Sequence, residues 1–290
     1  MHHFLAFCLS TPWALQPERM TAYAAVLAAR YAGTAPAAAT ERKARNAPAQ
    51  RGAIAVVPVY GTIVQRANQL DLCEGGTSTQ DLSAALRAAA EDPSVGQILL
   101  DIDSPGGSVF GVAELAAEIR SIRAQKPVVA IANSLAASAG YWIGAAAGEF
   151  YCTPGGEVGS IGVWSAHEDW SKAMEAAGVN ITLFSAGKFK TEGNPYGPMS
   201  DDGKAFAQQR VEDYYAAFTR DVAKGRGVGI DQVRNGMGQG RCLGADQALA
   251  EQMVDGVMTF DEVVAKMQRA QPPKGRSALK AARNELEILG

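Results

Sequence analysis

Segments with the pattern of buried strands alternate with amphipathic helices through the middle of the chain, and this alternation constrains the fold most. Three units follow one another: strand 53–61 with helix 79–91, strand 95–102 with helix 109–124, and strand 128–132 with a helix from about 139 to 147. The strand segments are apolar and rich in β-branched residues, as strands buried on both faces are. Repeated strand–helix units predict an α/β fold with a mostly parallel sheet.

The rest of the chain extends this pattern with less regular elements. Short strands are predicted at 149–153, 158–163, 181–185 and 254–258, and helices at 169–177, 201–225, 230–236, 244–251 and 260–270. Before the alternation, residues 17–32 have helical spacing and 34–51 are rich in Ala, Pro, Thr and charge, as linkers are. We therefore expect an N-terminal helical appendage at 1–33, a flexible linker at 34–51, a main domain at 52–270 and a basic tail at 271–290.

Composition excludes several classes of protein. A hydrophobic content of 47% and a charged content of 20% are those of a globular chain, and a net charge of -3 provides no overall basic field for nucleic acid. The four cysteines, Cys8, Cys73, Cys152 and Cys242, are too far apart for a zinc or disulfide framework. No apolar run is long enough to span a membrane, and the first residues lack an export signal. We expect a cytoplasmic protein without metal or cofactor.

A serine among small residues marks the first candidate for chemistry. Ser138 lies in the segment Asn-Ser-Leu-Ala-Ala-Ser-Ala-Gly-Tyr-Trp of residues 133–142, where the predicted strand turns into a helix. A serine is a poor nucleophile unless a neighbouring base activates it and donors stabilise the oxyanion. Small neighbours allow a sharp turn, and a helix that begins after the serine directs N–H groups towards the reacting carbonyl.

Lysine is the better candidate for the base, because the chain has only three histidines. His2 and His3 lie at the terminus, and His167 precedes a predicted helix, where an exposed histidine is common. Lys188 and Lys190 lie together in the segment 184–195. A lysine acts as a base only where burial or nearby positive charge lowers its pKa. Spacing alone does not decide between these two lysines, and Lys126 and Lys172 are harder to place in a site.

The segment Asp-Ser-Pro-Gly-Gly of residues 103–107 is a second candidate site element. It follows a predicted strand, at the edge of the sheet where α/β proteins bind ligands. Gly106 and Gly107 adopt positive φ without strain and can expose N–H groups to an oxyanion. An ordinary β-turn is the alternative meaning of a Pro-Gly step.

These motifs together resemble the signal peptide peptidase A family of serine peptidases and its soluble phage members of the lambda protein C type. The resemblance covers residues 53–257 through the motifs at 60–63, 103–107, 136–141, 159–163, 185–190 with 194–195 and 198–199, and 240–241 with 245 and 254–255. Several motifs in the same order are far more specific than any one of them. The fold that the resemblance implies is a crotonase/caseinolytic-protease (ClpP)-like superhelical β-α spiral.

The resemblance also implies roles for individual residues. Ser138 matches the nucleophile, Lys190 the general base, and Ser160 the serine that holds the lysine amine. Gly106 or Gly107, with the N–H of Ala139, matches the oxyanion hole; many relatives have glycine in place of Ala139. No cofactor or metal is implied. Because the chain has one copy of each motif, we expect a head-to-tail homo-oligomeric ring in which Lys190 serves the Ser138 of a neighbouring subunit.

The expected function is a serine endopeptidase that acts through a Ser-Lys dyad and an acyl-enzyme on protein or peptide substrates. The leader at residues 7–18 resembles that of phage members, which favours processing of capsid or scaffold proteins during head maturation. One alternative is a cytoplasmic peptidase that degrades signal peptides and other peptides. Another is a catalytically inactive ring that assists capsid assembly, although the intact serines and lysine count against it.

Overall fold

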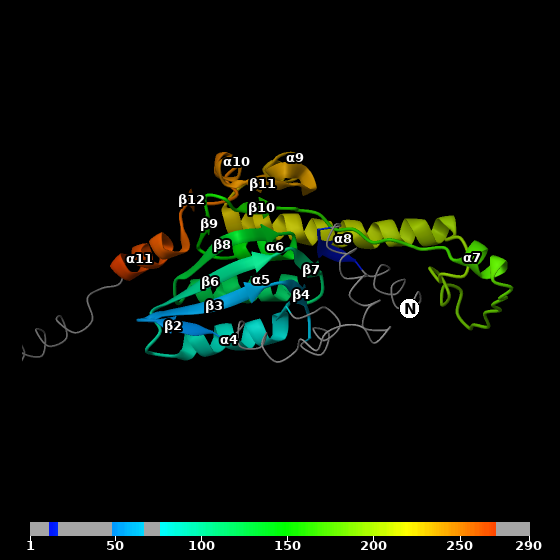
Figure 1. The fold of residues 1–290 in the computed structure, drawn as a ribbon, viewed down its shortest axis with the longest axis horizontal. Helices are drawn as coiled ribbons and strands as arrows, with labels where there is room; N and C mark the ends of the chain where they lie inside the picture. The colour runs from blue at the N-terminus through cyan, green and yellow to red at the C-terminus, as the bar shows by residue number, and fades with distance from the viewer. Residues whose placement is uncertain (1–11, 17–47, 67–75, 271–290) are drawn as a thin grey trace, which may run out of the picture.

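An eight-stranded, mostly parallel sheet forms the body of the computed structural model, which describes residues 12–16, 48–66 and 76–270 (Figure 1). Its main path has the strand order β11-β10-β8-β6-β3-β2, and β9 pairs with β8 and β12. These strands are β2 (Ala49–Arg51), β3 (Ile54–Tyr60), β6 (Gln97–Ser104), β8 (Val128–Ala137), β9 (Glu149–Cys152), β10 (Glu157–Gly159), β11 (Cys242–Gly244) and β12 (Gly256–Val257). Strands β3, β6, β8 and β10 are mutually parallel, so their carboxyl ends share one edge of the sheet.

Helices cover both faces of this sheet. The helices of the described residues are α4 (Thr79–Glu91), α5 (Val112–Arg123), α6 (Ala139–Ala145), α7 (Ser171–Ala176), α8 (Asp201–Arg226), α9 (Ile230–Asn235), α10 (Ala245–Ala250) and α11 (Phe260–Ala270), with a 3-10 turn at Met237–Gly240. Of these, α7 lies away from the sheet (Figure 1). Alternate residues of β6 divide between two cores: Ile98 and Leu100 pack with α4 and α5, and Leu99 packs with α11. Across the described residues, no helix combines the length and the hydrophobicity that a bilayer-crossing segment requires.

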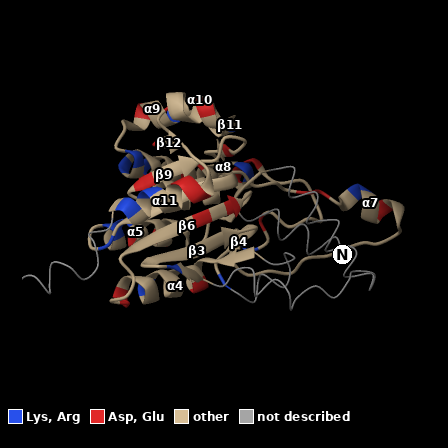
Figure 2. Cartoon of the chain, turned by 60° about the vertical axis from the view of Figure 1, so that its left-hand side comes forward, with Lys and Arg blue, Asp and Glu red and all other residues tan. Residues whose placement is uncertain are grey.

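Strands β3 and β4 carry little charge, whereas charged residues of both signs lie on the surrounding helices (Figure 2). The mixed α/β architecture with a parallel sheet confirms the predicted fold class at this level. Two predicted helices, 79–91 and 260–270, have the same bounds in the structure. Both begin at a capped residue: Ser78 Oγ accepts from the Asp81 N–H, and Thr259 and Glu262 form a reciprocal capping box.

A second, smaller sheet was not predicted from the sequence. Its order is β1-β7-β4-β5, formed by β1 (Trp13–Leu15), β7 (Gly106–Ser108), β4 (Thr62–Val64) and β5 (Gly76–Ser78). The segment 103–107 is therefore more than a turn, because β6 runs to Ser104 and β7 begins at Gly106. Residues 12–16 lie within the expected appendage 1–33 but form β1 in the body. The helix expected at 17–32 lies outside the described residues, as do most of the linker and the tail.

Residues 165–200 form an excursion from the body, drawn in yellow-green beside α7 in Figure 1. No residue of the excursion is buried. The strand predicted at 181–185 is wrong: this segment is exposed and has no secondary structure, because no strand within residues 12–16, 48–66 and 76–270 pairs with it. The strand predicted at 158–163 is shorter, since β10 ends at Gly159.

Candidate functional site

Ser138 lies at the junction between β8 and α6, at the carboxyl edge of the large sheet. Its backbone has φ 55° and ψ -116°, a conformation that is unfavourable for a residue with a side chain. The residue is 1% exposed, and its Oγ is buried without a hydrogen-bond partner in the part of the chain that the structure describes. A strained backbone and an unpaired buried hydroxyl both cost stability, and such costs concentrate at functional sites.

The packing of α6 holds this junction rigid. The ring of Trp142 stacks on Phe218 of α8 with centroids 4.5 Å apart, and its Nε1 donates to Asp221 Oδ2 at 2.9 Å. Asp221 also pairs with Arg120 of α5 at 2.8 Å. Every residue of α6 is buried, so the first turn after Ser138 is fixed by neighbours on several helices.

Ser160 lies next to Ser138 because β10 pairs in parallel with β8. The Ser138 N–H donates to the carbonyl of Gly159 at 2.7 Å, which places the residue after Gly159 beside the candidate nucleophile. Ser160 also has a positive φ of 52°, and its N–H donates to the Arg241 carbonyl at 2.8 Å. The structure thus brings together Ser138 and Ser160, two predicted site residues that are 22 positions apart in the sequence.

Of the two candidate glycines of β7, Gly106 lies against Ser138 and Gly107 lies against Ile63 of β4. A Cβ on Gly106 would lie 2.8 Å from Ser138 Cβ, and one on Gly107 would lie 1.8 Å from the Ile63 carbonyl oxygen. Neither position therefore accepts a side chain. Gly106 has φ 98°, and its N–H donates to Ser104 Oγ at 3.1 Å. That bond occupies the Gly106 N–H.

Ala139 is the first residue of α6, and its N–H has no partner within the helix, as for every first turn. It follows Ser138 directly and is fully buried. The predicted residues Ser138, Ala139, Ser160, Gly106 and Gly107 therefore come together at one place on the sheet edge.

The lysines are placed differently. Lys190 lies in the exposed part of the excursion, and within the described residues its ammonium has no hydrogen bond or ion pair. Lys188 has partners: its Nζ lies 3.9 Å from Asp202 Oδ2 and 4.5 Å from the centroid of the Phe189 ring. In Figure 1 the excursion lies apart from β8 and α6. Within one chain, Ser138 is therefore buried at the sheet edge, whereas Lys190 lies on the exposed excursion. His167 also lies in the excursion, where its Nε2 contacts the Gly197 carbonyl at 3.2 Å.

A buried acid near the same sheet edge was not predicted. Asp101 of β6 is 5% exposed and accepts a short hydrogen bond from the Tyr60 hydroxyl. Burial raises the pKa of Asp101 despite this bond, and burial followed by the Asp101 bond raises the pKa of Tyr60. Their separation of 41 residues, across two different strands, left no local signal in the sequence.

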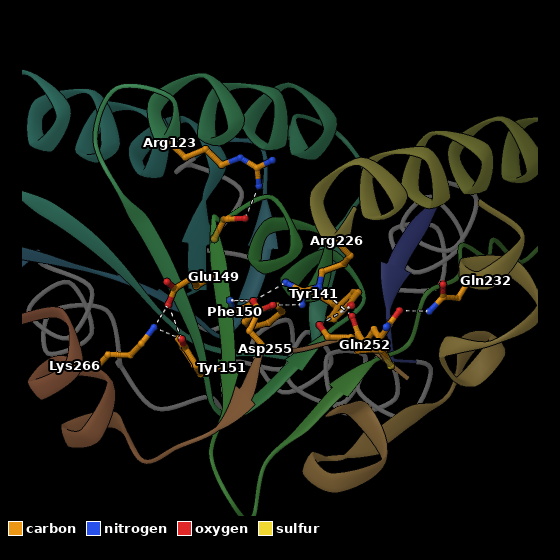
Figure 3. Close-up of polar contacts among 12 residues, drawn as sticks. Arg123, Tyr141, Glu149, Phe150, Tyr151, Arg226, Gln232, Gln252, Asp255 and Lys266 are labelled. Atoms are coloured by element: carbon orange, nitrogen blue, oxygen red, sulfur yellow. Dashed lines mark hydrogen bonds and ion pairs between the residues drawn. The ribbon is translucent and has the colours of Figure 1, made fainter. Parts of the chain in front are cut away.

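A polar latch formed by Arg226 and Asp255 joins the end of α8 to β9 of the large sheet (Figure 3). Arg226 donates to both carboxylate oxygens of Asp255 at 2.8 and 2.9 Å, and the Phe150 N–H donates to Asp255 Oδ2 at 2.7 Å. Burial acts to raise the pKa of Asp255, but the hydrogen bonds and the Arg226 charge outweigh it, so this pKa is lowered. No cluster of His, Cys, Asp and Glu in the described residues has the arrangement of a metal site.

Comparison with known proteins gives a consistent family. The model of peptidase family S49 matches residues 120–272. Capsid assembly protease C of Escherichia phage lambda is 40% identical over 192 residues, which cover 66% of this chain and 44% of that protein. Head-tail preconnector protein GP5 of Enterobacteria phage P21 is 36% identical over 62% of this chain and 36% of that protein. Protease 4 of Salmonella typhi is 31% identical over 74% of this chain and 34% of its own length. The match spans less than half of each of these relatives.

Proposed function

This chain belongs to peptidase family S49, and from that premise we propose that it hydrolyses peptide bonds with Ser138 as nucleophile and Lys190 as general base. The observation that carries the proposal is Ser138 itself. Its hydroxyl is buried and has no hydrogen-bond partner among the described residues, at a strained junction with Gly106 of β7 packed against it. An alcohol held in this way is available to a base that arrives from outside the chain.

The reaction would proceed through an acyl-enzyme. Neutral Lys190 accepts the Ser138 proton as Oγ attacks the carbonyl carbon, and the resulting ammonium gives that proton to the leaving amine as the C–N bond breaks. Water then gives a proton to the same lysine as it attacks the ester carbon, the bond from this carbon to Oγ breaks, and the lysine returns the proton to Oγ as the acid product leaves. Ser160 is proposed to accept a hydrogen bond from the lysine amine and so to orient its lone pair towards Ser138.

We propose the N–H groups of Gly107 and Ala139 as the oxyanion hole. The Gly106 N–H already donates to Ser104 Oγ, which favours Gly107 over Gly106 as the donor on β7. The Ala139 N–H follows the nucleophile at the start of α6 and has no helical acceptor. Two backbone donors held by strand and helix require no rearrangement as negative charge develops.

The base is proposed to come from a second copy of the chain in a head-to-tail ring. Large exposed hydrophobic side chains support this arrangement, because among the described residues all but one of them lie between residues 179 and 206. They are Val179, Ile181, Leu183, Phe184, Phe189 and Phe206, whereas Leu249 lies elsewhere. An apolar surface of this kind marks an interaction site. Docking of the excursion on a neighbour would bury these side chains and bring Lys190 into an enclosed site.

We also propose a finer fold assignment. The crotonase/ClpP-like superhelical spiral accords with the parallel strands β3, β6, β8 and β10 and with the small sheet that stands beside the large one. We retain 52–270 as the peptidase domain, 1–33 as an appendage, 34–51 as a linker and 271–290 as a tail.

We further propose that the peptidase acts on capsid or scaffold proteins during maturation of a phage head. This proposal rests on the similarity to capsid assembly protease C and to head-tail preconnector protein GP5. A peptidase that degrades signal peptides and other peptides is the alternative favoured by the similarity to protease 4. Co-expression with the neighbouring capsid genes distinguishes the two, because only the first predicts shortened capsid or scaffold proteins with wild type and full-length ones with Ser138→Ala.

Subunit mixing tests the shared site. Ser138→Ala and Lys190→Ala subunits, each inactive alone, are unfolded together and refolded at equal amounts. If each site joins the serine of one subunit to the lysine of the next, about a quarter of the sites regain both groups, and activity returns to about a quarter of wild type. Ser138→Ala mixed with the double variant is the control and stays inactive. Absence of activity in mixed oligomers verified by mass would contradict the shared site.

A further inference from the structure

Residues 12–16 lie in a slot between β7 and Trp164, beside Ser138, and are hydrogen-bonded on both sides as strand β1. On one side β1 pairs antiparallel with β7, with Trp13 opposite Ser108, Ala14 opposite Gly107 and Leu15 opposite Gly106. On the other side the Trp13 N–H donates to the Trp164 carbonyl at 2.8 Å, and the Trp164 N–H donates to the Trp13 carbonyl at 3.0 Å. The segment is therefore an extended peptide whose backbone is bound along both edges.

The register of β1 places the Ala14 carbonyl at the candidate reaction centre. The point where a Cβ on Gly106 would lie is 2.2 Å from the Ala14 oxygen and 2.8 Å from Ser138 Cβ. The Gln16 N–H donates to the Pro105 carbonyl at 3.1 Å. Hydrogen-bonded pairs alternate along antiparallel strands, so the next such pair is Ala14 with Gly107, the residue whose N–H is proposed for the oxyanion hole.

Side chains also hold the segment in place. Ala14 is 0% exposed and Leu15 1%, and Trp164 Nε1 donates to the Leu15 carbonyl at 2.8 Å. The segment thus covers the Ser138 side of the slot and leaves no free edge on β7 for another strand. A peptide that is to reach Ser138 in extended form has to take the place of β1.

We propose that β7 and Trp164 form the peptide-binding slot of this enzyme, and that residues 12–16 are a built-in competitor that must leave before a substrate strand can bind. The proposal rests on the proposed function, because it assigns the slot to that same Ser138 site. It identifies the ligand as an extended peptide bound through its backbone on two sides, with a small residue opposite Gly107. Ala14 fills that position in the chain itself.

A binding experiment that does not depend on catalysis tests this. In a Ser138→Ala background, the affinity for a fluorescently labelled synthetic peptide of residues 11–17 is measured by anisotropy with and without Leu15→Asp. A charge at this buried position expels β1, because an unpaired carboxylate is costly to bury. A tethered competitor acts at an effective concentration of the order of millimolar, so its release should tighten binding about tenfold or more. Leu249→Asp changes an exposed leucine and serves as the matched control.

The outcomes distinguish the proposed peptide-binding slot from the proposed peptidase function. Tighter binding with Leu15→Asp but not with Leu249→Asp supports the slot, whereas equal affinity for all variants, or no binding to any, overturns it. If Leu15→Asp fails to fold by its thermal melt, Ala14→Pro, which removes a backbone donor from β1, replaces it in the same comparison. Reaction of otherwise wild-type protein with a fluorophosphonate probe reports separately on the nucleophile: absence of labelling, with peptide binding intact, refutes the proposed function and not the slot.

Discussion

Ser138 is 1% exposed at the end of a central strand, whereas the excursion that carries Lys190 contains no buried residue at all. The serine's surroundings come from five elements of the same chain, β8, α6, β10, β7 and β1. The excursion's hydrogen bonds join it mainly to itself, as where the Trp170 N–H donates to the Pro195 carbonyl at 2.8 Å. One half of the proposed dyad is thus preorganised within the chain, and the other depends on what the excursion docks against.

Substitution of the lysines is expected to give the largest change in activity among the tests of this contrast between the Ser138 site and the excursion. Lys190→Ala should lower kcat/KM for an extended peptide by about 10²–10⁴-fold, because a general base contributes a factor of this size. Lys188→Ala is the matched control: its partners, Asp202 and Phe189, lie on or next to the excursion, and its loss should change the rate by less than about threefold. Equal losses for both variants would mean that the two lysines are not distinguished as proposed.

Alanine substitutions at Gly225 and Gly197 compare how tightly α8 and the excursion are packed. A Cβ on Gly225 of α8 would lie 1.9 Å from the Ala145 carbonyl oxygen at the end of α6, whereas one on Gly197 in the excursion meets nothing within 4 Å. Gly225→Ala should lower the free energy of unfolding by about 1–3 kcal/mol, because backbone must move to relieve the overlap. Gly197→Ala should leave it within about 0.5 kcal/mol. Urea denaturation measures both, and similar values would show that α6 is not held tightly against α8.

The sequence predicted regions of local order well and regions that depend on distant partners poorly. Helices 79–91 and 260–270 were predicted to the residue, because their caps and apolar faces are encoded locally. The strand at 181–185 was not formed, since a strand needs a neighbour and the described part of the chain provides none. Strand β1 was missed because it spans three residues and pairs with residues more than ninety positions away.

The residues of the candidate site likewise fall into those with a local sequence signal and those that depend on distant partners. Ser138, Ala139 and the glycines of β7 could be found because small residues after a strand are a local signal, and the structure brings them together with Ser160. The Gly106 N–H bond to Ser104 Oγ, which separates the two glycines, depends on side-chain geometry that no spacing reveals. The role of Lys190 remains a prediction, since the excursion that carries it is exposed in the single chain and its contact with a second subunit is itself a proposal.

The apolar surface of the excursion gives a smaller expected effect. Phe184 is 92% exposed, so Phe184→Asp should leave the unfolding of the chain nearly unchanged while weakening self-association about tenfold, or about 1.4 kcal/mol. Leu249→Asp, which changes an exposed leucine outside the excursion, should leave association unchanged. Analytical ultracentrifugation over a concentration series measures this. Unchanged association of the Phe184 variant would place the subunit contact elsewhere.

The smallest effect concerns the latch between Arg226 and Asp255 and its dependence on pH. Asp255→Asn removes the charge that pairs with Arg226, and we expect a loss of about 1 kcal/mol at pH 7, a modest value because the Asp255 side chain is 38% exposed. The pKa of Asp255 is lowered in the folded chain, so its contribution is fully present above the unfolded value of about 3.9 and declines as the pH falls through the folded pKa. The difference between wild type and Asp255→Asn in urea denaturation should therefore be constant from pH 7 to about 5 and shrink below about 4.

Asp202, in the first turn of α8, supplies the control for the latch. Asp202 is 74% exposed and lies 3.9 Å from Lys188, so Asp202→Asn should change the unfolding free energy by less than about 0.5 kcal/mol at any of these pH values. A difference for Asp255→Asn that grows as the pH falls would contradict the lowered pKa, because it would require the folded chain to hold the proton more tightly than the unfolded one. Equal effects of the two substitutions would contradict the expected electrostatic contrast between the latched Asp255 and the more exposed Asp202.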